Sequence, residues 1–366
     1  MATTKLAPIR TLDLFAGAGG LSEGFREGSD RFSTVRAVEM DTAAAATYAS
    51  NHGDDLVFTG PIEEWLAQEE VPFVDIVLGG PPCQGFSTLG KQDAEDVRNF
   101  LWKQYAETVK RAQPKYFVVE NVAAFTKSRQ FEDFRRETSE AGMLSNYSFD
   151  WRVLNSADYG AAQARKRTVI LGWRDDQEAP GFPEPTHGPG RTHAHVTVGQ
   201  AFEQRGMAAA VSTIDLPPNR ARVLNGRAVS GPYRAAELHV TRYYTELSRE
   251  RFAHIPEKGN RFDIPFELLP DCWKKHTSGS ADVMGRLHWD KPSVTVRTEF
   301  FKPEKGRYLH PVEDRALTHY EAATLQGFPD EYLFMGSKIE IARQIGNAVP
   351  IALGAAIGRH LAGLID

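Results

Sequence analysis

Short apolar runs alternate with longer helical patterns through the first half of the chain. The pattern from about Asn99 to Gln113 is the clearest helix, because its apolar residues recur at helical spacing and Pro114 ends it. The apolar runs predict strands at residues 11–15, 35–40, 73–78, 115–119 and 167–172. Strands that alternate with helices are typical of an α/β fold, in which helices cover both faces of a parallel sheet.

The pattern changes after Ala179, where prolines and glycines crowd the following positions. Up to about Val312 the chain is irregular, as expected of loops carried on a small scaffold. Residues 318–327 and 351–364 are again helical and apolar. We therefore predict a first domain at residues 1–178, a second at 179–312, and a C-terminal segment at 313–366 that returns to the first domain.

The composition is that of an ordinary folded protein. A chain of 366 residues with 41% hydrophobic and 25% charged residues can form about two compact units. No apolar run approaches the ~18 residues of a membrane span, and no signal-peptide core follows Met1, so we expect a cytoplasmic protein. The two cysteines, Cys83 and Cys272, are too few for a disulfide framework or a four-thiolate zinc site.

The net charge of the chain argues against a protein that coats nucleic acid without sequence preference. The formal net charge is -5, whereas a general nucleic-acid coat should be basic. Residues 176–285 are an exception, because their acidic and basic side chains balance. The histidines His187, His193 and His195 of this interval lack a carboxylate or thiolate at a convincing spacing, so no metal is expected.

A glycine-rich turn follows the first predicted strand. Residues 16–20 read AGAGG, which lets backbone N–H groups approach a ligand closely, although such a turn can also be purely structural. Glu39 ends the second strand, where folds of this kind place an acid that binds ribose hydroxyls. Together the two features favour a nucleoside cofactor.

The third and fourth strands end in a thiol and a carboxylate. Cys83 follows the prolines Pro81 and Pro82 just beyond a strand, which positions its thiol rather than burying it as a small hydrophobic side chain. Glu120 ends the next strand, although a helix-capping role is the alternative. Because ligands of open α/β sheets bind at the carboxyl edge, we expect both side chains to meet the glycine turn and Glu39 there.

A basic run precedes the fifth strand. In extended backbone Gln163, Arg165 and Arg167 point to one side, so one amide and two guanidinium groups face together. The run can be read as a solvated basic edge or as a clamp for an anion or the edge of a nucleobase.

In this order, the motifs resemble those of the cytosine-5 DNA methyltransferases. The matching runs are DLFAGAGG at 13–20, GPPCQGFS at 80–87, ENV at 120–122, QARKR at 163–167, RLHWDKPSVTV at 286–296, LTHYEAATLQGFPD at 317–330 and QIGNAVP at 344–350. Only about residues 179–284 lie outside the likeness, and in this family that interval reads the target sequence. The resemblance implies a Rossmann-like methyltransferase sheet that binds S-adenosylmethionine, with a smaller, irregular target-recognition domain.

The resemblance also assigns roles to individual residues. It makes Cys83 the nucleophile that adds to C6 of a flipped cytosine, while Glu120 contacts N3 and the exocyclic amine, and Arg165 and Arg167 hold the base and nearby backbone. The residues implied to surround S-adenosylmethionine are Phe15, Gly17, Gly19, Gly20, Leu21, Glu39, Met40, Ile62, Pro82, Leu101, Asn347 and Val349. The residues expected to contact DNA are Gln84, Ser87, Gln163, Arg242 and Arg297.

One position departs from the family pattern. The family usually has an aspartate before the isoleucine that packs on adenine, whereas here Pro61 precedes Ile62. Proline has no side-chain acceptor for the adenine amino group. We expect a backbone carbonyl or Asp41 to replace that contact, or a weaker affinity for the cofactor.

The resemblance implies S-adenosylmethionine-dependent methylation of cytosine C5 in duplex DNA. The expected enzyme acts as a monomer near the nucleoid, alone or beside a cognate restriction endonuclease. One alternative is the same chemistry on transfer RNA. Another is a non-catalytic DNA-binding regulator of the same fold. A nicotinamide dehydrogenase would share the fold class but would leave the loop of Cys83 and Glu120 unexplained.

Overall fold

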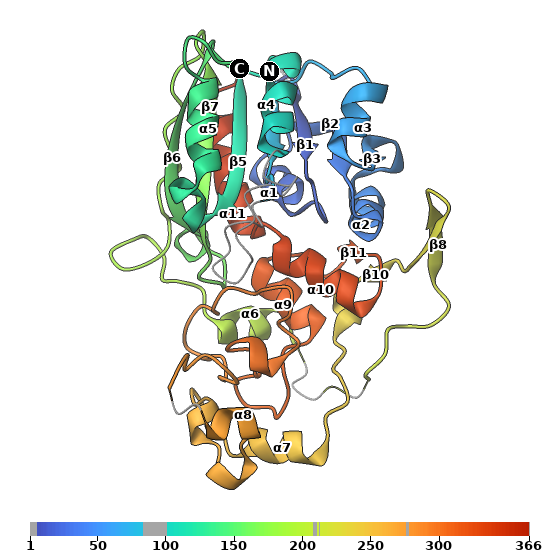
Figure 1. The fold of residues 1–366 in the computed structure, drawn as a ribbon, viewed down its shortest axis with the longest axis vertical. Helices are drawn as coiled ribbons and strands as arrows, with labels where there is room; N and C mark the ends of the chain where they lie inside the picture. The colour runs from blue at the N-terminus through green and yellow to red at the C-terminus, as the bar shows by residue number, and fades with distance from the viewer. Residues whose placement is uncertain (1–5, 83–100, 208–210, 212, 276–277, 366) are drawn as a thin grey trace, which may run out of the picture.

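The centre of the molecule is a seven-stranded sheet in the order β3-β2-β1-β4-β5-β7-β6 (Figure 1). The computed structural model describes residues 6–82, 101–207, 211, 213–275 and 278–365. The strands of the sheet are β1 (Ile9–Leu14), β2 (Phe32–Glu39), β3 (Val57–Thr59), β4 (Ile76–Gly79), β5 (Tyr116–Val122), β6 (Tyr147–Asn155) and β7 (Lys166–Arg174). All five predicted strands are present, and β3 and β6 are additional.

The sheet is mostly parallel rather than wholly parallel. The pairs from β3 to β5 are parallel, but β7 runs antiparallel to both β5 and β6. The predicted α/β fold with helices on both faces of a parallel sheet is confirmed, and the antiparallel strands at one end are an addition to it. Because β7 is reversed, it begins rather than ends at the edge where β5 finishes, and Val122 pairs with Arg167 there.

Helices cover both faces of this sheet. The helices of this half and of the C-terminal end are α1 (Gly20–Gly28), α2 (Thr42–His52), α3 (Ile62–Gln68), α4 (Leu101–Ala112), α5 (Arg129–Glu137) and α11 (Ile351–Ala362). Val77 and Phe117 join the core under α3, α4 and α5, whereas Ile76 and Val118 join the core under α1 and α11. The predicted helices at 99–113 and 351–364 are confirmed as α4 and α11.

The pairing of α1 with α11 is unusually close. A Cβ atom added to Gly24 of α1 would lie 2.8 Å from the Cα of Gly354 in α11, so the two backbones nearly touch. Only glycine at this crossing permits such an approach. Residues from the two ends of the sequence thus cover one face of the sheet together.

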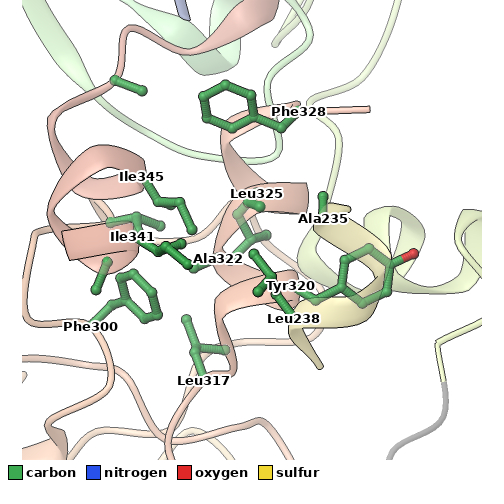
Figure 2. Close-up of a cluster of buried hydrophobic side chains, with 14 of the residues drawn as sticks. Ala235, Leu238, Phe300, Leu317, Tyr320, Ala322, Leu325, Phe328, Ile341 and Ile345 are labelled. Atoms are coloured by element: carbon green, nitrogen blue, oxygen red, sulfur yellow. The ribbon is translucent and has the colours of Figure 1, made fainter. Parts of the chain in front are cut away.

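A second core lies below the sheet in the view of Figure 1 and gathers segments from far apart in the sequence. It is built on α9 (His319–Gln326) and α10 (Lys338–Asn347), with α6 (Val198–Gln204) beside them. Figure 2 shows Leu317, Leu325 and Ile341 of this core pointing toward Phe300 and Leu238. The C-terminal segment therefore supplies much of the core beneath the variable interval as well as α11. The predicted boundaries at 178 and 312 stay a prediction.

The variable interval adds small elements around this second core. They are β8 (Ala221–Leu224), β9 (Arg227–Ser230), β10 (Tyr233–Arg234), β11 (Leu333–Phe334), α7 (Glu246–Ala253) and α8 (Asp271–Lys274). The buried Arg286 joins this region by donating to the carbonyls of Phe252, Ile255 and His310. Among the described residues, no helix is both long and apolar enough to cross a membrane.

Candidate active site

The strand register aligns several predicted site residues at one edge of the sheet. Leu14 of β1 pairs with Val38 of β2 and with Gly79 of β4, and Gly79 in turn pairs with Val119 of β5. The next residue along each strand therefore reaches the same edge, and these residues are Phe15, Glu39, Gly80 and Glu120. The predicted convergence at the carboxyl edge of the parallel strands is a consequence of this register.

A cavity of about 620 Å³ lies at this edge. All but one of the residues implied to surround the cofactor line it, namely Phe15, Gly17, Gly20, Leu21, Glu39, Met40, Ile62, Pro82, Leu101, Asn347 and Val349. Glu120, Arg165 and Arg167 line the same cavity. Cys83, Gln84 and Ser87 lie outside the described residues, and Pro82, the neighbour of Cys83, is on the cavity wall.

The exception is Gly19, which does not line the cavity. It caps α1 with φ 85°, and an added Cβ would lie 2.8 Å from His52 Nε2 and 2.9 Å from the hydroxyl oxygen of Tyr332. Gly19 thus serves the packing behind the glycine turn. The hydroxyl of Tyr332 donates to the carbonyl of Ala18 and so fixes the turn from that side.

Glu39 holds the glycine turn in place. Its Oε2 accepts the N–H of Gly17 at 2.8 Å, and its Oε1 accepts the N–H of Asp41 at 2.7 Å. Burial raises the pKa of Glu39, while these two backbone donors act in the opposite direction. The carboxylate is therefore committed on one lone pair of each oxygen and keeps others for the hydroxyl groups of a ligand.

Asp13 is a buried acid that the sequence analysis did not assign. It lines the cavity, is 1% exposed and accepts the Ser22 hydroxyl at 2.6 Å. Burial raises the pKa of Asp13 to about 7, Ser22 acts against this rise, and nearby Glu39 adds to it. The available signal in the sequence was an acidic residue inside the first predicted strand, shortly before the glycine turn at residues 16–20.

Glu120 and Arg167 form an ion pair inside the cavity. The guanidinium Nε of Arg167 lies 2.8 Å from Oε1 of Glu120, and both side chains are mostly buried. This oxygen accepts no well-aligned hydrogen bond from the described residues, so it keeps an acceptor for a ligand. Gly80 allows the neighbouring loop to pass close by, because an added Cβ would lie 3.4 Å from Glu120 Oε2.

Gln163 and Arg165 point to one side, as predicted, but they point into the protein. Arg165 donates to the carbonyls of Val296 at 2.9 Å and Gly346 at 3.0 Å, and Gln163 accepts the N–H of Val296 at 2.8 Å. Gln163 is 0% exposed and also donates to Gln326, so it connects protein segments rather than presenting a surface for DNA. Burial lowers the pKa of Arg165 to about 9, and the neighbouring Arg167 adds to this effect.

Asp41 and Pro61 both line the cavity near Ile62. Oδ1 of Asp41 accepts the N–H groups of Ala43 and Ala44 and caps α2, while Oδ2 lies 3.7 Å from Arg343. Arg343 and Glu340 of α10 line the cavity as well and were missed, because nothing in the sequence connects α10 with the end of β2.

The remaining predicted residues lie elsewhere. Arg242 and Arg297 are exposed, and the guanidinium of Arg242 lies 5.5 Å from the ring centre of Tyr244. In the part of the chain that the structure describes, no group of three or more His, Cys, Asp or Glu side chains could hold a metal ion. His195 instead pairs with Asp158 at 2.9 Å.

The cavity suits a nucleoside cofactor that carries a positively charged centre. The ring of Phe15 and the side chains of Ile62 and Leu101 offer apolar contact, Glu39 offers acceptors for hydroxyl groups, and the glycine turn offers backbone donors. Acidic side chains at Asp13 and Glu39 favour a cationic centre when they are ionised. The turn itself depends on glycine at Gly17 and Gly19, whose φ angles are +56° and +85°.

Comparison with known proteins gives a consistent result. The family model for C-5 cytosine-specific DNA methylase matches residues 9–363. The Type II methyltransferase M1.HphI of Haemophilus parahaemolyticus is 36% identical over 354 residues, covering 94% of this chain and 84% of the relative. M.XorII of Xanthomonas oryzae, also a Type II methyltransferase, is 34% identical over 378 residues, covering 96% of this chain and 84% of the relative.

A solved structure shares the fold. It is a prophage-encoded E. coli protein described as a DNA modification methyltransferase, and it superposes with a TM-score of 0.72 at 24% identity. The superposition covers 97% of this chain and 99% of the E. coli chain. The overall fold is therefore shared with a protein of low sequence identity.

Proposed function

The chain belongs to the C-5 cytosine-specific DNA methylases and is a DNA cytosine-5 methyltransferase, and from this we propose how its residues perform the reaction. We propose that S-adenosylmethionine binds in the cavity between the glycine turn and Glu39. When bound, this cofactor supplies an electrophilic methyl group on a sulfonium centre. The observation that carries the proposal is that Glu120, Arg167, Pro82 and the glycine turn line one cavity.

The residues of the cavity divide between the two reactants. Glu39, Ile62 and the glycine turn hold the nucleoside, while the ionised form of Asp13 provides negative charge for the cationic sulfur. Asn347 and Val349, at the end of α10, close the opposite wall. The target cytosine enters on the side of Pro82, Glu120 and Arg167, and it must leave the DNA stack to do so, at a cost of a few kcal/mol.

Covalent addition makes cytosine C5 reactive. The thiolate of Cys83 adds to C6, and the electron pair of the C5–C6 bond becomes available at C5, which takes the methyl group. Glu120 binds N3 and the exocyclic amine and stabilises the charge that develops on the ring during this addition, and Arg167 holds its carboxyl in place. Removal of the C5 proton by a base and expulsion of the Cys83 thiolate then restore the aromatic ring.

The second core and the variable interval carry the recognition of duplex DNA in this proposal. Arg242 and Arg297 are exposed and are the described residues proposed to contact DNA, together with Gln84 and Ser87 beyond the described part. Arg297 directly follows Val296, whose carbonyl accepts a hydrogen bond from Arg165, a residue that lines the cavity. We propose that the enzyme acts as a monomer on duplex DNA and protects that DNA against a cognate endonuclease.

Transfer of a labelled methyl group tests this function. The purified protein is incubated with tritiated S-adenosylmethionine and with duplex DNA or transfer RNA. We expect label on C5 of cytosine in the duplex, loss of labelling with Cys83→Ser, and DNA binding by that variant close to the wild-type level. Label only in transfer RNA would show that transfer RNA, and not duplex DNA, is the substrate. Wild-type turnover of Cys83→Ser would show that Cys83 is not the nucleophile.

A further inference from the structure

The hairpin of β8 and β9 lies in the interval expected to read DNA, but it packs against segments that contribute residues to the cavity. In Figure 1 the yellow-green segment with β8 extends along the side of the molecule below α2. β8 and β9 pair in antiparallel register, and Asn225 and Gly226 form the turn between them with φ of 49° and 74°. The hairpin contacts three segments that contribute residues to the cavity wall, and none of the hairpin residues lines the cavity.

The first contact is with the loop between β3 and α3. The side-chain amide of Asn225 donates to the carbonyl of Thr59 at 3.2 Å. Thr59 directly precedes Gly60, Pro61 and Ile62, which all line the cavity. Arg222 pairs with Asp54 nearby. The tip of the hairpin thus fixes the strand end from which this cavity wall continues.

The second contact is with α2, whose first turn lines the cavity. Val229 of β9 is 3% exposed and packs in one apolar cluster with Ala43, Ala46 and Met335. Ala44 and the capping residue Asp41 lie on the cavity side of the same turn. The carbonyl of Ser230, next to Val229, accepts the N–H of Gly336 at 2.7 Å and so ties the hairpin to the chain that leads into α10.

The third contact is with α10. Arg227 of β9 lies 2.5 Å from Oε1 of Glu340, which lines the cavity. The other carboxylate oxygen of Glu340 accepts the N–H and hydroxyl of Ser337 at 2.8 Å. Both oxygens of Glu340 are therefore held, and Arg343, one turn further along α10, lies 3.7 Å from Asp41 instead.

We propose that the β8–β9 hairpin positions the walls of the cofactor cavity and does not read DNA, with Arg227 as its main positioning residue. Both arginines within the hairpin are paired with acids outside the variable interval, Arg222 with Asp54 and Arg227 with Glu340, so neither offers a free cation to a phosphate or a guanine. Contact with the 59–62 loop, α2 and α10 from outside restricts the movement of three walls at once. The inference rests on the proposal that S-adenosylmethionine occupies this cavity.

The test measures cofactor and DNA separately for matched variants. Binding of S-adenosylmethionine to the protein without DNA is followed by titration calorimetry for wild type, Arg227→Ala, Arg227→Lys, and a triple variant with Ala at Arg222, Asn225 and Arg227. The matched control is Arg220→Ala, because Arg220 pairs with Glu237 at 2.8 Å inside the variable interval and does not line the cavity. DNA from cells that express each variant is sequenced for methylated cytosines.

We expect the cofactor dissociation constant to rise about two- to fivefold for Arg227→Ala, as for loss of one exposed ion pair, and further for the triple variant. Arg227→Lys should recover most of the affinity, and Arg220→Ala should leave the affinity unchanged. For Arg227→Ala and the triple variant, KM for the cofactor should rise while kcat at saturation and the methylated sequence stay the same. Unchanged cofactor affinity of the triple variant would overturn the inference, as would a changed methylated sequence. If wild type itself fails to bind S-adenosylmethionine, the proposed function fails instead.

Discussion

The side-chain amide of Asn121 donates to the carbonyl oxygen of Pro81 at 3.0 Å and connects the end of β5 with the loop that leads to Cys83. Asn121 is 6% exposed, and its side-chain oxygen accepts the N–H of Val122 at 2.8 Å. The amide therefore has partners at both ends. Because Glu120 is the preceding residue, a single hydrogen bond fixes the spacing between the carboxyl group and the start of the thiol-bearing loop.

Replacement of Asn121 by Ala should slow the chemical step more than it weakens binding. The carbonyl of Pro81 loses its donor, and small misplacement of a reacting group is costly to rate. We expect kcat to fall by about tenfold or more, with KM for the cofactor within about twofold of wild type. Asn155→Ala, which removes an amide outside this cavity, is the control. A rise of KM alone would contradict this account.

Replacement of Glu39 by Ala should act mainly on cofactor affinity. It removes the acceptor for Gly17 and Asp41 and leaves both N–H groups without their carboxylate. Hydrogen bonds to a charged group contribute about 1.5–3 kcal/mol each, so the cofactor dissociation constant should rise about tenfold or more. Glu39→Gln retains one acceptor and should lie between wild type and Glu39→Ala. An unchanged KM for the cofactor would show that Glu39 takes no part in binding.

The stability of the free enzyme should depend on pH through Asp13. Its pKa is raised from 3.8 to about 7 by burial, so the folded state holds this proton more tightly than the unfolded chain does. The contribution of Asp13 is thus fully present below about pH 4 and is lost as the pH rises toward 7. Asp13→Asn cannot ionise and can still accept from Ser22.

The comparison of wild type with Asp13→Asn isolates that group. The free energy of unfolding of the variant should gain on wild type by on the order of 2 kcal/mol between pH 5 and pH 8, measured by urea titration. A difference that stays constant over this range would mean that Asp13 is ionised throughout.

Replacement of Gly346 by Ala should destabilise the protein strongly. An added Cβ would lie 2.4 Å from the backbone nitrogen of Thr298, and backbone cannot move aside as a flexible side chain can. We expect a loss of about 2–3 kcal/mol, together with lower activity because the Gly346 carbonyl binds Arg165. Gly363→Ala is the control, since the nearest atom to its added Cβ is 3.5 Å away. Equal stability of the two variants would contradict the packing described.

The strands and the site edge were predictable because their signals are local. An apolar run that ends in a glycine or an acid marks both a buried parallel strand and the edge where it stops, and this held for β1, β2, β4 and β5. β6 was missed because it is an edge strand whose residues Asp150, Trp151 and Arg152 are exposed, so its apolar pattern is interrupted. β3 has only three residues. The direction of β7 depends on its partners and has no signature in its own residues.

The contacts across the chain could not be predicted from one sequence. Gln163 has a polar side chain beside two arginines, which suggests an exposed surface, yet its partners are Val296 and Gln326. Arg227 is an arginine of the interval expected to read DNA, yet its partner is Glu340. In each case the partner lies more than a hundred positions away, and composition near the residue carries no information about it.

The close crossing of Gly24 and Gly354 means that packing of α1 is completed only by the last helix of the chain. Helix α11 is translated last, so a chain that lacks it leaves part of the apolar sheet face around Ile76, Leu78 and Val118 covered by α1 alone. Native closure waits for residues 351–362 to emerge. We therefore expect a product truncated before this helix to aggregate, even though every proposed catalytic group has already been synthesised.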